Sequence, residues 1–91
     1  MNIRIHVVIS GKVQRVYFRQ STKDKAIELD VSGWVKNRGD GSVEAVFEGT
    51  KQDVDEIVKW CWKGPELAKV KEVQLIHEEY TGEFSGFAII R

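Results

Sequence analysis

The stretch GWVKNRGDGSVEAVF (residues 33–47) predicts a β-hairpin, and the rest of the fold can be built around it. Residues Trp34–Asn37 form a short first strand of this hairpin. In the second strand every other residue from Val43 to Phe47 is hydrophobic, which is the period of a strand with one buried face. Residues Arg38–Gly41 lie between them and predict a turn, because Gly and Asp tolerate positive φ. Two strands joined by so short a turn pair as antiparallel neighbours.

The residues before this hairpin predict a strand, a loop and a helix. Hydrophobic, β-branched residues occupy alternate positions over Ile3–Ile9, and Gly11 is expected to end this first strand. Residues 12–19 connect the strand to a helix that begins at about Phe18 or Ser21 and ends near Asp30. The face of this helix that packs on the core contains Thr22, Ala26 and Leu29.

The residues after the hairpin predict a second helix. Thr50, with Asp53 three residues later, resembles the capping box that begins many helices. Apolar residues then follow the i, i+3, i+4, i+7 spacing of a buried helical face, namely Val54, Ile57, Val58 and Cys61. The pair Gly64-Pro65 predicts the end of the helix, with the glycine as a left-handed cap and a proline that cannot continue it.

Two more strands complete the predicted fold. Apolar residues between positions 70 and 76 indicate a fourth strand that is irregular near Val70, and Phe87 and Ile89 anchor a short last strand. The order β-α-β-β-α-β is the split βαβ, ferredoxin-like pattern. We therefore expect a single α+β domain over residues 1–91, in which a mostly antiparallel sheet carries two helices on one face. This fold hosts many functions, so the activity must be inferred from particular residues.

Charge and composition limit the partners. The chain has 14 basic and 14 acidic residues, so no general attraction to nucleic acids or anionic membranes is expected. No apolar run approaches the ~20 residues that span a bilayer, and the N-terminus lacks a signal-peptide pattern. The single cysteine, Cys61, excludes an intramolecular disulfide and fits a reducing compartment. We therefore expect a cytoplasmic protein without a membrane partner.

Residue types that bind metals are few and scattered. His6, His77 and Cys61 do not form a zinc-binding spacing, so we expect no metal and no cofactor. Each histidine lies on a predicted strand, where an exposed or hydrogen-bonded side chain is more common than a general base. Cys61 continues the apolar stripe of its helix and is interpreted as a small core residue.

The connection between the first strand and the first helix is the first candidate site. The segment GKVQRVYFR (residues 11–19) turns where several backbone N–H groups can point at one spot and bind an anion. The start of the helix adds partial positive charge, and the planar guanidinium of Arg19 matches phosphate oxygens. Taken alone, this signal is weak, because an arginine at a helix start is more often a solvated surface residue.

The end of the second strand is the other candidate site. Asn37 is the last residue of this strand and precedes the glycine-rich turn. An asparagine there can serve turn geometry alone, which its spacing favours. Alternatively, its neutral amide can offer a hydrogen-bond donor and an acceptor to a water molecule.

Together, the two segments resemble the two signature motifs of the acylphosphatase family. Residues 11–19 resemble G-x-V-Q-G-V-x-F-R, and residues 33–49 match G-[aromatic]-V-K-N-x3-G-x-V-x5-G throughout. The likeness extends over nearly the whole chain, including Gly64-Pro65 and the closing residues 86–89. Two long motifs in this order, on the expected β-α-β-β-α-β frame, are highly specific.

The resemblance implies hydrolysis of the carboxyl–phosphate bond of acyl phosphates by a monomer without metal or cofactor. Arg19 would bind the phosphate, and Asn37 would orient the attacking water. The remaining phosphate ligands would be the backbone amides of the loop residues Gln14, Arg15, Val16, Tyr17 and Phe18. The sequence does not choose among different acyl groups.

One residue departs from the family pattern and keeps alternatives open. Arg15 stands where the pattern has glycine, so its side chain either is solvated or adds a second cation near the phosphate. We expect it to point away from the bound phosphorus. A catalytically silent, anion-binding module is one alternative function. An RNA-binding ferredoxin-like domain is a weaker one, because Phe47 belongs to the predicted core and no aromatic RNA-binding motif is present.

Overall fold

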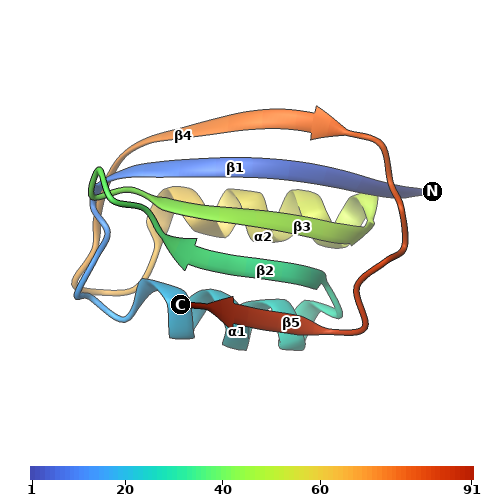
Figure 1. Ribbon diagram of the computed structural model, residues 1–91, viewed down its shortest axis with the longest axis horizontal. Coiled ribbons are helices and arrows are strands. Elements are labelled where there is room, and N and C mark those ends of the chain that lie inside the picture. Colours follow the sequence, from blue (N-terminus) through green and yellow to red (C-terminus); the bar gives the residue numbers. More distant parts are fainter.

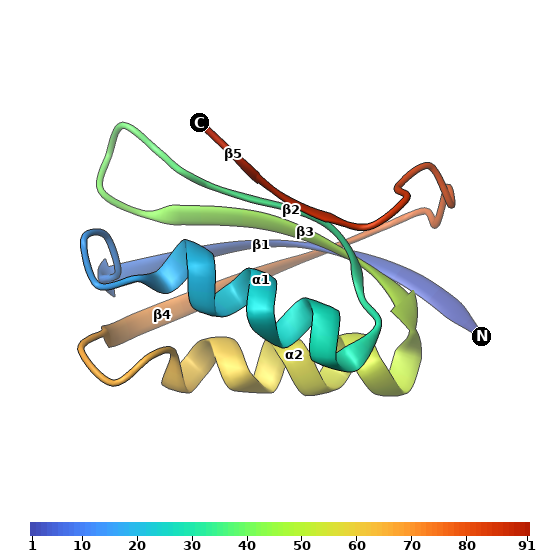
Figure 2. The same ribbon diagram turned by 90° about the horizontal axis from the view of Figure 1, so that it is seen from below.

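The computed structural model describes residues 1–91 and shows a five-stranded sheet with two helices on one face (Figures 1 and 2). The elements in chain order are β1 (Asn2–Lys12), α1 (Phe18–Leu29), β2 (Ser32–Asn37), β3 (Val43–Thr50), α2 (Lys51–Lys63), β4 (Lys69–Glu78) and β5 (Phe87–Ile90). The strand order in the sheet is β4-β1-β3-β2-β5, and only the pair of β2 with β5 is parallel. The predicted ferredoxin-like α+β sandwich is confirmed.

A single hydrophobic core fills the space between the sheet and the helices. It contains the alternating residues of β1 and β3 and the apolar stripe of α2, and Phe47 of β3 stacks on Phe87 of β5 at 5.9 Å between ring centroids. Phe47 is fully buried, as predicted, so it is not available to stack on a nucleic-acid base. Cys61 is also fully buried, and burial raises the pKa of its thiol. It is therefore an inert core residue.

The prediction that Gly11 ends the first strand was wrong. β1 continues to Lys12. Opposite the step from Ser10 to Gly11, β4 runs over two residues, from Glu72 to Val70, so β4 bulges at Lys71. Gly11 has φ +120°, and a Cβ at this position would lie 2.3 Å from the Lys69 carbonyl oxygen. Glycine is needed here to continue the strand through the bulge rather than to end it. The irregularity expected near Val70 is this same bulge, seen from β4.

The helix boundaries follow local signals. The Thr50 side chain accepts a hydrogen bond from the N–H of Asp53 at 3.2 Å, so the predicted N-cap of α2 is confirmed. α2 ends at Lys63, and the N–H of Gly64 donates to the carbonyl of Trp60 at 2.8 Å. The prediction that Gly64 adopts the left-handed helical conformation was wrong. Its φ is positive, at 65°, but its ψ of −172° lies outside that region.

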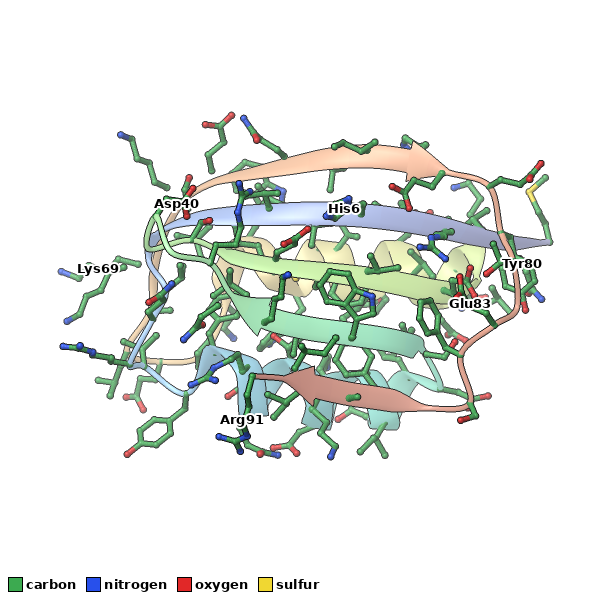
Figure 3. The ribbon with its side chains drawn as sticks, in the orientation of Figure 1. His6, Asp40, Lys69, Tyr80, Glu83 and Arg91 are labelled. Atoms are coloured by element: carbon green, nitrogen blue, oxygen red, sulfur yellow. The ribbon has the colours of Figure 1, made fainter.

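The face of the sheet opposite the helices carries charged side chains that pair with one another. His6 lies on this face of the sheet (Figure 3). Its ring nitrogen Nε2 lies 2.6 Å from a Glu44 carboxylate oxygen. The buried Glu48 carboxylate accepts hydrogen bonds from the backbone N–H groups of Thr81 and Gly82. His6 is thus a hydrogen-bonded strand residue, as predicted. No helix is both long and apolar enough to cross a membrane.

Candidate active site

The two sequence segments meet in one open pocket. The C-terminal ends of β1 and β2 and the start of α1 lie at the same end of the molecule (Figures 1 and 2). The pocket has a volume of about 420 Å³ and is lined by Val13, Arg15, Tyr17, Phe18, Arg19, Gln20, Asn37, Ile89 and Arg91. Arg91 follows β5 at this end of the sheet (Figure 3). Arg19 and Asn37 are 18 residues apart in sequence and are brought together by the antiparallel sheet.

The loop between β1 and α1 has free backbone donors. Arg15 and Tyr17 both have positive φ, 63° and 65°, which costs a non-glycine residue roughly 1–2 kcal/mol each. Residues 14–17 lie between β1 and α1, and none of their N–H groups donates a hydrogen bond to a backbone carbonyl. Left-handed residues alternating along a loop turn successive N–H groups toward one concave side, which is the geometry of an anion-binding nest. The loop is therefore strained, with its donors unused by the protein itself.

Arg19 lies in the first turn of α1, on the wall of the pocket. Its side chain is half-buried. The residue before the helix, Tyr17, makes no side-chain cap hydrogen bond, so the first N–H groups of α1 lack a cap. These groups and the helix dipole add positive potential beside the guanidinium. An anion in the pocket would meet the guanidinium of Arg19, the N–H groups of the loop and the positive end of α1.

Asn37 is the last residue of β2 and faces the same pocket. Its side-chain oxygen Oδ1 is the one buried side-chain nitrogen or oxygen atom with no hydrogen-bond partner. A buried amide oxygen without a partner costs roughly 1–3 kcal/mol in desolvation, and native structures avoid this unless a ligand or water supplies the bond. Turn geometry alone leaves this oxygen without a hydrogen-bond partner.

Gln14 fixes the loop against the turn that follows Asn37. Its side-chain Nε2 donates to the carbonyl oxygens of Arg38 at 2.8 Å and Ser42 at 2.9 Å. Within the turn, the Asp40 carboxylate accepts hydrogen bonds from the side chain and the N–H of Ser42, which hold the pKa of Asp40 below its usual value. The two halves of the site are thus tied together by a side chain.

The predicted loop residues do not all line the pocket. Arg15, Tyr17 and Phe18 line it, whereas Val16 is buried and contributes to the core. Sequence reasoning gave Gln14 only a backbone role and missed its side-chain bridge. It also missed Ile89 and Arg91 as lining residues, because only tertiary packing brings β5 beside α1. Val13 and Gln20, which flank the predicted residues in sequence, line the pocket as well.

The comparisons with known proteins identify the family. The sequence pattern that describes the acylphosphatase family matches residues 5–89. An acylphosphatase of Pelotomaculum thermopropionicum is 58% identical over 94% of this chain and 94% of its own length. The chain belongs to the acylphosphatase family. Its activity is hydrolysis of the carboxyl–phosphate bond of acyl phosphates, which yields a carboxylate and inorganic phosphate.

Other acylphosphatases agree in sequence and in structure. The acylphosphatase of Chloroflexus aurantiacus is 50% identical over 97% of this chain and 96% of its own length. The structure of an acylphosphatase from Coxiella burnetii superposes with a TM-score of 0.92 at 39% identity, over 98% of this chain and 93% of that one. The acylphosphatase of Bacillus subtilis has a TM-score of 0.94 at 28% identity, over 98% and 99% of the two chains. Sequence and fold therefore point to the same enzyme family.

Proposed function

We propose that Arg19 and the loop amides of residues 14–18 bind the phosphate of the substrate and that Asn37 orients the attacking water. The observation that carries this proposal is the buried, unpartnered Asn37 Oδ1, which lines the same pocket as Arg19. A water that donates a hydrogen bond to Oδ1 is held beside a phosphate bound by the nest and the guanidinium. Positioning of this kind is a main source of catalysis in phosphoryl transfer.

The chemistry requires few protein groups. The water oxygen attacks phosphorus in line with the oxygen that bridges to the acyl group, and that P–O bond breaks. The carboxylate leaves without a general acid, because it is a weak base. The proton of the water passes to a phosphate oxygen, so the products are a carboxylate and inorganic phosphate. Arg19 and the N–H groups stabilise the charge on the equatorial oxygens in the transition state.

We further propose that residues 1–91 act as one acylphosphatase-like domain, as a monomer in the cytoplasm. The sheet and both helices share one core. Arg19, Asn37 and the phosphate loop line one pocket within a single copy, so the proposed site does not require a second copy. The free, buried Cys61 fits a reducing compartment.

Activity is expected to be independent of divalent metal ions. The positive charge at the phosphate comes from guanidinium and N–H groups, and no aspartate, glutamate, histidine or cysteine side chain lines the pocket. Protein treated with EDTA should therefore hydrolyse benzoyl phosphate at the same rate as untreated protein. The fall in the ultraviolet absorbance of benzoyl phosphate measures this rate. The monoester 4-nitrophenyl phosphate should be a poor substrate, because its leaving group is more basic. Loss of activity with EDTA that Mg²⁺ restores would contradict the proposed mechanism.

A further inference from the structure

The pocket holds more positive charge than one phosphate group needs. Three arginines line it, Arg15, Arg19 and Arg91, and no acidic residue does. The ion pairs of the protein all lie elsewhere and use none of these three side chains. Like charges gathered without acidic side chains beside them repel one another. The arrangement is therefore suited to a ligand that brings more negative charge than one phosphate.

The three arginines differ in how far they are buried. Arg19 is half-buried at the start of α1, whereas Arg15 and Arg91 are exposed at the rim. In the proposed mechanism the loop binds phosphate through backbone N–H groups, so the Arg15 side chain is free to extend beyond the phosphate. The part of an acyl phosphate that extends beyond the phosphate is its acyl group. The exposed arginines are thus placed to contact the acyl group.

The backbone conformation of Arg15 also indicates that its side chain has a role in the site. Its φ of 63° belongs to the left-handed region that glycine adopts without strain, and the family pattern has glycine at this position. The chain thus carries a long cationic side chain where the backbone favours glycine. Strained residues at a functional site commonly have a role that the strain serves. Arg15 makes no ion pair that would explain its presence structurally.

We propose that Arg15, assisted by Arg91, recognises a second oxyanion on the acyl group, so that the enzyme prefers acyl phosphates with a carboxylate or phosphate at the far end of a short acyl chain. This inference rests on the proposed function of the pocket. The planar guanidinium can bind either group through two parallel hydrogen bonds. Because the rim is open to solvent, each such ion pair contributes little binding free energy. The expected preference in kcat/KM is therefore only about three- to tenfold.

Two substrates of equal chain length isolate the effect. Succinyl phosphate carries a terminal carboxylate, and butyryl phosphate carries a methyl group in its place. We expect Arg15→Asn to lower the ratio of kcat/KM for succinyl phosphate over butyryl phosphate by about three- to tenfold, mainly through KM. Asparagine tolerates positive φ, so this variant keeps the loop conformation. The matched control is Lys59→Gln, which removes one charge from the exposed side of α2 and should leave the ratio unchanged.

A third substrate and added salt complete the test. With 3-phosphonopropionyl phosphate, a fall in the corresponding ratio assigns the rim to phosphate-type groups, whereas a fall with succinyl phosphate alone assigns it to carboxylates. Both results support the inference, and 0.5 M salt should weaken the preference in the unmodified enzyme. The inference is overturned if Arg15→Asn changes neither ratio while all three substrates are hydrolysed. If the unmodified enzyme hydrolyses none of them, the proposed function itself fails.

Discussion

Arg19→Gln should lower kcat/KM for benzoyl phosphate by about 10²–10³, which is the usual effect of removing one preorganised donor from a transition state. The substitution removes a charged, planar group from both the bound substrate and the transition state. We therefore expect KM to rise and kcat to fall, and inhibition by inorganic phosphate to weaken in parallel. Steady-state kinetics with benzoyl phosphate, with phosphate as competitive inhibitor, measure all three quantities.

The control for this prediction is Arg38→Gln. Arg38 is an exposed arginine on the turn outside the pocket, where it pairs with Asp40, so its loss should change kcat/KM little. Thermal unfolding of both variants shows whether they fold. Arg19 is not the phosphate ligand if Arg19→Gln unfolds normally and keeps both the phosphate inhibition and the kcat/KM of the unmodified enzyme.

Asn37→Ala should lower kcat by about 10²–10³ and leave KM and phosphate inhibition nearly unchanged. The amide is proposed to hold the water and not the substrate, so its loss misplaces the nucleophile. The variant should unfold at a temperature close to that of the unmodified protein, because no other protein group makes a hydrogen bond to the Asn37 Oδ1 atom. Steady-state kinetics and thermal unfolding measure the two effects.

Lys36→Ala is the matched control for Asn37→Ala. Lys36 is the adjacent residue of β2, and its ammonium group lies 5.6 Å from the centre of the Trp34 ring rather than in the pocket. It should retain most of the kcat. A normal kcat in a folded Asn37→Ala variant, or an equal loss in Lys36→Ala, would show that the Asn37 amide does not orient the water.

Local sequence patterns determine most of the fold. Val43 and Ala45 alternate with polar neighbours because one face of β3 covers the core, so the strand and its hairpin with β2 are readable from period alone. The start of α2 is equally local, since Thr50 contacts the N–H of a residue three positions away. Such signals do not depend on distant parts of the chain.

The features that were missed depend on contacts between distant segments. Gly11 lies opposite a bulge in β4, a strand nearly 60 residues later in the chain. The parallel pairing of β2 with β5 likewise joins distant segments. At the site, the two sequence motifs predicted Arg19 and Asn37, and both line the pocket. The bridge from the Gln14 side chain to Arg38 and Ser42 spans 24 and 28 residues and has no periodic signature.

Incorporation of ¹⁸O from labelled water tests most directly whether water held in this pocket attacks phosphorus. Benzoyl phosphate is hydrolysed by the enzyme in H₂¹⁸O, and the two products are analysed by mass spectrometry. If the water that Asn37 orients attacks phosphorus, the P–O bond breaks, and one ¹⁸O atom should appear in inorganic phosphate with none in benzoate. Label found in benzoate instead would mean that water attacks the acyl carbon, and that result would contradict the mechanism.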